Sequence, residues 1–289
     1  MAFDQVIGAA TRWQVQVEAL AALGAALTLE LSDTKAPDEL ADALHGVVAA
    51  AGLGDVRELP PPQQAMVLSL VRSTLLQAAD LIDDPARPLG WAYTDPVILD
   101  GWGRGSTMIP GIIAAAHDDL REVDAFLDVG VGVGLLAITA ATTWPTARVV
   151  GVDIWEPSLA RARANVAEAR LQDRIELRAL DVVDLEDVDS YDCVWLPSFF
   201  LTEEALARAL PALVRATRPG GWIAIGRFAS PPDPLAHAVL SLRTIRAGGC
   251  NLEGDRTVAL LEAAGCESVH EAPRTHPAPL ELVLGRRPR

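Results

Sequence analysis

Three glycines at two-residue spacing follow an aspartate in the stretch "DVGVGVG", which runs from Asp128 to Gly134. Bare backbone at such a turn lets a ligand approach closely, and the carboxylate beside it selects which ligand is suitable. A dinucleotide-binding fingerprint G-x-G-x-x-G that began at Gly130 would need its last glycine at position 135, where Leu135 stands. A carboxylate is also poorly suited to a pyrophosphate. The pattern therefore favours a ligand that carries a cationic ammonium group and no phosphate.

Two further acids follow the next two apolar runs. Asp153 ends the run "VVGVD", where it can accept hydrogen bonds from two ribose hydroxyls, and Ile154 and Trp155 beside it can pack on an adenine face. Asp181 lies in "ALDVVD", where it can accept a hydrogen bond from an adenine amino group. S-adenosylmethionine has an ammonium group, a ribose and an adenine. We therefore expect S-adenosylmethionine as the cofactor and S-adenosylhomocysteine as its product.

The elements that carry these acids follow from the hydrophobic pattern. Residues 1 to about 120 are rich in Ala and Leu and have helical periodicity. From about Val123, short apolar runs alternate with helical segments, which indicates a parallel sheet with crossover helices. We expect strands at 125–129, 148–153, 174–179, 191–196, 222–227, 268–272 and 280–284. We expect helices between them at 135–143, 157–169, 203–217 and 256–264.

The segments "DVGVGVG", "GVDIWEP", "LDVVD", "YDCVWLPSFF" and "ATRPGGWIAIGR" resemble the class I S-adenosylmethionine-dependent methyltransferases, from about Val123 to the C-terminus. The resemblance implies an α/β fold with a Rossmann-like seven-stranded sheet whose last strand is antiparallel. With an all-helical domain at 1–120 before the methyltransferase domain at 121–289, the chain resembles the small-molecule O-methyltransferase branch. That branch often dimerises through its helical domain, which we also expect to act as a substrate lid. The expected cofactor site comprises Asp128, Gly130, Gly132, Gly134, Asp153, Ile154, Asp181 and Val182.

The segment after the fourth expected strand departs from a related pattern. In plant-type O-methyltransferases with a helical front domain, a His-Asp pair stands there, whereas "WLPSFFLTEE" contains no histidine. This puts a phenol-deprotonating mechanism of that kind in doubt. Ser198, Phe199 and Phe200 instead form a mostly apolar wall suited to a flat aromatic substrate.

A polar-aromatic stretch, "GWAYTDPVILDGWGRGSTMIPGI", joins the two expected domains. As a linker folded over the cofactor, it would let Arg104 pair with the cofactor carboxylate and let Tyr93 touch the methyl donor or the acceptor. Trp91 and Trp102 would then contact the substrate. The alternative is that these are core aromatics and a surface arginine at a domain boundary.

The segment after the fifth strand, "FASPPDPLAHAVLSLRTIRAGG", is longer than a plain crossover requires. It contains His237, the histidine that we would choose as a base. A solvated or hydrogen-bonded helix residue is the more usual reading of such a histidine.

The net charge disfavours two classes of partner, and the cysteines argue against disulfides and a metal site. A formal net charge of -15 and a pI near 4.7 disfavour a nucleic acid or an anionic membrane surface. Cys193, Cys250 and Cys266 are odd in number and widely spaced, so they suit neither a disulfide framework nor a zinc site, and we expect no metal. The first residues lack the pattern of a secretory signal. A cytoplasmic location is expected.

These observations lead to an expected function. The chain is expected to methylate a small aromatic or heteroaromatic metabolite in natural-product biosynthesis, with an oxygen acceptor slightly favoured. The alternative is C- or N-methylation of an indole-like heterocycle, since such atoms need less help from a base. An NAD(P)-dependent reductase and a non-catalytic partner subunit are more distant alternatives.

Overall fold

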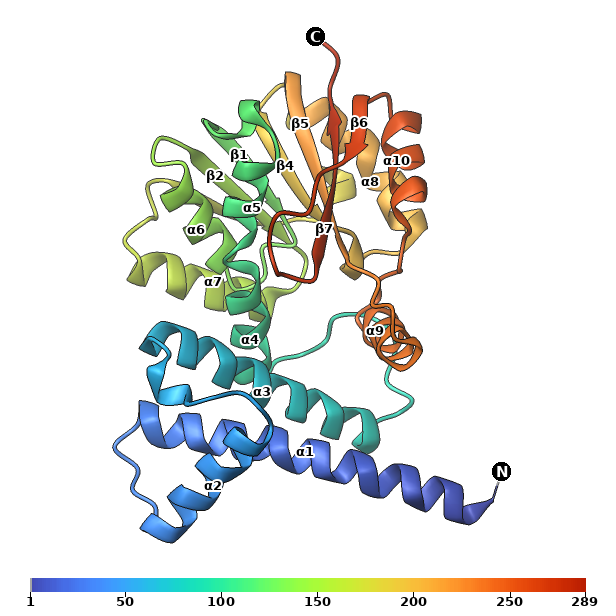
Figure 1. The fold of residues 1–289 in the computed structure, drawn as a ribbon. Helices are drawn as coiled ribbons and strands as arrows, with labels where there is room; N and C mark the ends of the chain where they lie inside the picture. The colour runs from blue at the N-terminus through green and yellow to red at the C-terminus, as the bar shows by residue number, and fades with distance from the viewer. Residues whose placement is uncertain (1) are drawn as a thin grey trace. The chain divides into compact units, whose positions relative to one another are not determined.

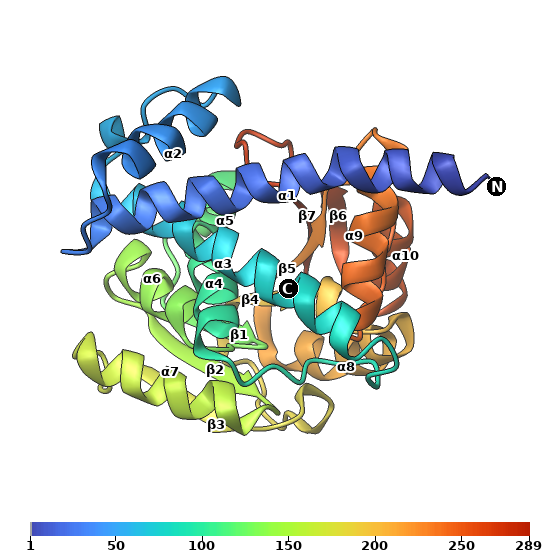
Figure 2. The same ribbon diagram turned by 90° about the horizontal axis from the view of Figure 1, so that it is seen from below.

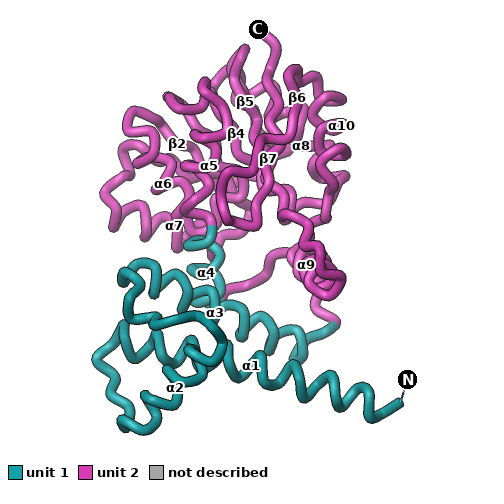
Figure 3. The backbone as a smooth tube through the Cα atoms, in the orientation of Figure 1, with its two compact units in different colours: residues 1–85, 95–105 teal, residues 86–94, 106–289 magenta. Residues whose placement is uncertain are grey.

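The computed structural model describes residues 2–289 (Figure 1), which form two compact units (Figure 3). The helical unit runs to Pro85 and resumes over Asp95–Gly105. The sheet unit takes Ala86–Thr94 and Ser106–Arg289. The division expected near residue 120 falls inside the sheet unit, because the helix and the turn before the first strand pack with the sheet.

The helical unit is built around a small apolar cluster. Its helices are α1 (Phe3–Leu31), α2 (Asp38–Ala50), the short η1 (Val56–Glu58), α3 (Pro61–Asp83) and α4 (Pro96–Ser106). Leu27, Val48 and Leu68 bring α1, α2 and α3 together in its core. Among the described helices, α3 alone is long and apolar enough to cross a membrane by length and composition. In this unit α3 packs along α1.

The sheet unit contains seven strands in the order β3-β2-β1-β4-β5-β7-β6. The strands β1 to β5 pair in parallel, and β7 pairs antiparallel with both β5 and β6, as the resemblance implied. The strands are β1 (Ala125–Val129), β2 (Arg148–Asp153), β3 (Ile175–Ala179), β4 (Tyr191–Pro197), β5 (Thr217–Phe228), β6 (Glu267–Glu271) and β7 (Leu280–Arg286).

Helices cover both faces of this sheet (Figure 1 and Figure 2). The first layer comprises α5 (Ile109–Ala116), α6 (Leu135–Thr143) and α7 (Glu156–Glu168), and the second comprises α8 (Glu203–Ala216) and α10 (Gly254–Ala263). Two cores result, because side chains of β1 point alternately into one layer, as Phe126 does, and into the other, as Leu127 does. Burial on both faces explains the nearly continuous apolar runs in the central strands.

The irregular segments of the sheet unit lie at the carboxyl edge of the parallel strands. They include the glycine loop after β1, the turn after β2, η3 (Val182–Asp184) after β3 and η4 (Ser198–Phe200) after β4. The helix α9 (Pro234–Arg246) follows β5 and belongs to neither covering layer (Figure 1). The strand order reverses between β1 and β4, which is where open α/β sheets bind their ligands.

Two segments differ from the sequence-based expectation. β5 begins at Thr217 rather than at Trp222, because Thr217 pairs with Tyr191 across an irregularity in the β4–β5 register and Gly220 takes a left-handed φ of 81°. The expected linker over the cofactor is mostly helical, since α4 and α5 take up most of it. Ala86–Thr94, which we call the strap, belongs to the sheet unit and is neither helix nor strand.

Candidate functional site

The glycine loop is held in place by the backbone of the neighbouring strand. The amides of Gly130 and Val131 donate to the carbonyl oxygen of Val152 at 2.8 and 3.0 Å. Gly132 has a φ of 54°, and a Cβ built on it meets no heavy atom nearer than 3.9 Å. A side chain at this position would therefore be strained and would project into the open space in front of the loop. The loop keeps that space clear for a ligand.

The Asp153 carboxylate joins the glycine loop to the turn after β2. Its Oδ2 accepts from the Gly132 amide at 2.8 Å, and its Oδ1 accepts from the Trp155 amide at 2.8 Å. Burial raises the pKa of Asp153, and these backbone donors oppose that rise. A carboxylate has about four lone-pair positions, so the backbone donors leave Asp153 with acceptor capacity for a ligand hydroxyl. Asp153 is thus fixed in orientation and still able to bind a ribose diol.

Asp128 is a buried acid that lacks part of its hydrogen bonding. Its side chain lies at the end of β1, the residue is 1% exposed, and Oδ2 has no hydrogen-bond partner among the described residues. Burial, and next the nearby charge of Asp153, raise its pKa well above the usual range. An unpaired polar group of this kind destabilises the fold unless a ligand satisfies it. The ammonium group of S-adenosylmethionine has the charge and the donors that Asp128 lacks.

The remaining expected cofactor contacts lie at the ends of β2 and β3. Asp181 caps η3 by accepting from the Val183 amide at 3.1 Å. Val182 is buried, whereas Ile154 is 73% exposed although it is a large apolar residue. An exposed isoleucine beside Asp153 suits the flat face of an adenine, which would cover it. The residues at this edge therefore fit S-adenosylmethionine in charge, in shape and in polarity.

The strap is bonded to the turn after β2 and to the end of α9. The Trp155 indole Nε1 donates to the Tyr93 carbonyl oxygen at 2.9 Å, and the Gly90 amide donates to the Arg246 carbonyl oxygen at 3.1 Å. Gly248 allows the second contact, because a Cβ there would lie 2.9 Å from the Gly90 Cα. The strap therefore runs from the residue two beyond Asp153 to the end of α9.

Aromatic rings form a continuous row from the strap to the end of β5. Successive ring centroids lie 5.3, 5.2, 4.9 and 4.3 Å apart, and the last two rings are stacked while the others meet edge to face. In order, the row comprises Tyr93, Trp91, Phe200, Phe199 and Phe228. It joins rings from three separate chain segments and ends in a cavity.

That cavity, which we call the β5 pocket, lies beyond the ends of β4 and β5. Phe199 and Phe228 line it together with His237 from α9, and the His237 Nδ1 lies 3.1 Å from the Ser230 hydroxyl oxygen. The pocket thus contains two expected site residues, Phe199 and His237. The sequence analysis did not predict that Arg227 and Phe228 line this pocket. A charged residue followed by an aromatic residue at the end of a buried strand could have indicated it.

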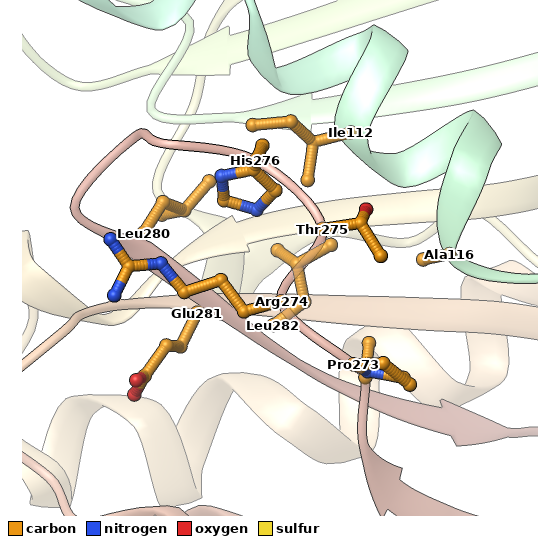
Figure 4. A pocket seen from close by; sticks show the side chains of 10 residues that line it. Ile112, Ala116, Pro273, Arg274, Thr275, His276, Leu280, Glu281 and Leu282 are labelled. Atoms are coloured by element: carbon orange, nitrogen blue, oxygen red, sulfur yellow. The ribbon is translucent and has the colours of Figure 1, made fainter.

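A second cavity lies between α5 and the loop that joins β6 to β7 (Figure 4). Ile112, His276 and Leu280 line it, and it contains none of the residues expected at the site. Its polar lining residues Arg274, Thr275 and His276 belong to that loop. Neither the residues of the glycine loop nor Asp153 line this cavity.

Three expected residues have other contacts. The Ser198 hydroxyl is buried and donates to the Gly226 carbonyl oxygen at 2.9 Å, which ties β4 to β5. Trp102 and Arg104 lie on α4 in the helical unit, where the Trp102 indole donates to Gln77 Oε1 at 3.3 Å. The ligand contacts expected for Ser198, Trp102 and Arg104 stay predictions. Among residues 2–289, no group of three or more His, Cys, Asp or Glu side chains is placed to hold a metal ion.

Comparison with known proteins adds to this geometry. Residues 126–221 match a family model described as a methyltransferase domain. The chain is 33% identical over 116 residues to the 27-O-demethylrifamycin SV methyltransferase of Amycolatopsis mediterranei, which covers 40% of this chain and 42% of that protein. It is 28% identical over 108 residues to a tRNA1(Val) (adenine(37)-N6)-methyltransferase of Vibrio campbellii, covering 37% of this chain and 45% of that protein. The aligned part thus spans less than half the length of these curated relatives.

A solved structure extends the likeness to the whole chain. Human N-acetylserotonin methyltransferase in complex with S-adenosylmethionine superposes with a TM-score of 0.70 at 15% identity, and the alignment covers 100% of each chain. At this identity the match shows a shared fold, which includes both the helical segment and the sheet.

Proposed function

We propose that this chain, which carries an S-adenosylmethionine-dependent methyltransferase domain of the class I fold, methylates a small aromatic or heteroaromatic metabolite. The observation that carries this proposal is the aromatic row. It begins at Tyr93, whose carbonyl is bonded to Trp155 beside the expected ribose site, and it ends at Phe228 in the β5 pocket. Flat faces and edges of this kind select a planar acceptor.

The residues at the carboxyl edge bind and orient the cofactor in this proposal. Asp153 holds the ribose, Asp128 pairs with the ammonium group, and Ile154 and Val182 contact the adenine. The bound cofactor supplies an activated methyl group on a sulfonium. The remaining task of the chain is to hold the acceptor in line with that methyl group and to exclude water.

The charge of the chain also supports a small-molecule acceptor. The net charge of -15 opposes binding to a nucleic acid backbone, although several similar proteins are named for RNA substrates, among them a tRNA, an rRNA and U6 snRNA. Two similar proteins are named for small acceptors, a rifamycin and N-acetylserotonin. We propose a role in natural-product biosynthesis with an oxygen acceptor, as the name of the rifamycin methyltransferase suggests.

The experiment is a methylation screen. The protein is incubated with S-adenosylmethionine and a panel of phenols, hydroxyquinones and indoles, and mass spectrometry detects products that are heavier by one methylene. We expect methylated product from the flat hydroxylated compounds, and its formation should be lost in Asp153→Ala. Methylation of tRNA or of protein in place of every small compound would contradict the proposal.

We also propose that α1 forms a homodimer. Phe3, Val6, Trp13 and Val17 are all at least half exposed, and together with Ala10 they follow the 3-4-3-4 spacing of a coiled-coil seam. An exposed apolar seam of this length is stabilised by a second copy of the same helix.

The oligomeric state is measured by light scattering coupled to size-exclusion chromatography. We expect a dimer for the unmodified protein and a monomer for Trp13→Glu. Val15 is 63% exposed but lies off the seam, so Val15→Glu is a matched control that should stay dimeric. If all three proteins are monomers, the seam does not mediate dimerisation.

A further inference from the structure

The β5 pocket places a histidine beside two aromatic rings. His237 lies on α9 and Phe199 lies in η4, with Phe228 stacked on Phe199 at a ring distance of 4.3 Å. The Ser230 hydroxyl lies 3.1 Å from the His237 Nδ1. If that nitrogen carries the proton and donates to the serine oxygen, the His237 Nε2 keeps a free lone pair.

The end of β4 connects the pocket to the glycine loop, where the methyl donor is expected. A Cβ built on Gly130 of the glycine loop would lie 3.5 Å from the Pro197 Cγ, and Pro197 is two residues before Phe199. Pro197 at the end of β4 thus lies against the glycine loop, and Phe199, two residues further along the chain, lines the pocket.

Other ionisable groups of the pocket are less suited to take a proton. Arg227 is held by Glu271 at 2.8 Å and by Glu281 at 2.6 Å, and as a cation it has no lone pair to offer. The Cys250 thiol donates to the Leu201 carbonyl oxygen, and burial raises the pKa of this thiol, which keeps it neutral. Glu253 is the remaining alternative to His237, and it is exposed at the start of α10.

We propose that His237 is the general base of the methyl transfer, and that Ser230 is the residue that positions it. This inference rests on the proposed function and narrows its acceptors to planar hydroxylated aromatics. As the oxygen–methyl bond forms, the sulfur–methyl bond breaks and its electron pair stays on sulfur. The O–H proton of the acceptor goes to the His237 Nε2, and because His237 is exposed, the proton then passes to water. The base thus comes from α9 and not from the segment after β4.

The test uses 4-nitrophenol, a flat phenol whose absorbance reports its own ionisation. It is titrated with the complex of the protein and S-adenosylhomocysteine at a pH where the free probe is mostly neutral. We expect a saturable increase of the phenolate band. His237→Ala should lower this signal about tenfold or more, and Ser230→Ala should lower it less, because the serine only orients the ring. His270→Ala is the matched control, since His270 lies on β6 outside the pocket, and it should behave as the unmodified protein.

Calorimetry with S-adenosylhomocysteine on the same proteins separates the two proposals. If the unmodified protein does not bind S-adenosylhomocysteine, the proposed function fails and this inference fails with it. If it binds S-adenosylhomocysteine but gives no saturable phenolate signal, only the assignment of His237 is overturned. A signal that persists in His237→Ala, or that is lost in Glu253→Gln instead, overturns the assignment as well.

Discussion

Replacing Asp153 by alanine is expected to weaken S-adenosylhomocysteine binding about 100-fold or more, since two hydrogen bonds to a carboxylate contribute roughly 3 kcal/mol or more together. The same change removes the acceptor of the Gly132 amide, so the glycine loop loses one of its anchors. Because the loss combines a ligand contact with the preorganisation of the loop, we expect the largest effect of any single substitution at the carboxyl edge.

Isothermal titration calorimetry measures this effect, and thermal denaturation confirms that the variant is folded. Asp173 precedes β3 at the opposite edge of the sheet, so Asp173→Ala is the matched control and should bind like the unmodified protein. Asp153→Asn should bind with intermediate affinity, because its amide oxygen still accepts one of the two hydrogen bonds. Equal affinities for Asp153→Ala and the unmodified protein would exclude Asp153 from the cofactor site.

Replacing Asp128 by asparagine is expected to weaken cofactor binding about tenfold or more while it stabilises the ligand-free protein. Burial raises the pKa of Asp128 in the folded state. A carboxyl group with a raised folded-state pKa stabilises the fold below its unfolded pKa and loses that contribution as the pH rises through the folded pKa. Asparagine cannot ionise. The variant should therefore keep its stability over the pH range in which the unmodified protein loses it.

Two measurements check this prediction. The melting temperature of Asp128→Asn minus that of the unmodified protein should increase with pH when no ligand is present. In calorimetry, S-adenosylhomocysteine binding should release a proton from the unmodified protein, because an ammonium group beside Asp128 lowers its pKa. The heat of binding would then depend on the ionisation enthalpy of the buffer, and this dependence should be absent in the variant. A proton release that persists in Asp128→Asn would assign it to another group.

The sequence predicted the strands and the glycine turn at the carboxyl edge because local rules determine them. The helix α6 begins at Leu135 as expected, since Gly134 takes a left-handed φ of 79° directly before it. Asp128 is the last residue but one of β1 and Asp153 is the last residue of β2, so the sheet topology alone brings both to one edge. Residue type, spacing and strand order were sufficient at these positions.

The acceptor side was harder to predict, because tertiary contacts determine it. The strap reaches the site through a bond from a side chain, Trp155 Nε1, to a backbone oxygen of Tyr93, and no spacing rule links two residues so far apart in sequence. Ser198 was expected to face a substrate, yet its hydroxyl donates a hydrogen bond to the Gly226 carbonyl oxygen in β5. The Phe199–Phe228 stack likewise joins the ends of two different strands. These contacts follow from packing and not from any local pattern.

A crystal structure of the complex with S-adenosylhomocysteine tests the central claim most directly. We predict that the ribose hydroxyls lie within hydrogen-bond distance of Asp153, that the adenine covers Ile154, and that the amino group faces Asp128. The glycine loop and the strap should keep their present conformations, since Gly132 and Trp155 already fix them. Density for the ligand in the cavity between α5 and the β6–β7 loop (Figure 4), with nothing at the carboxyl edge, would contradict the account.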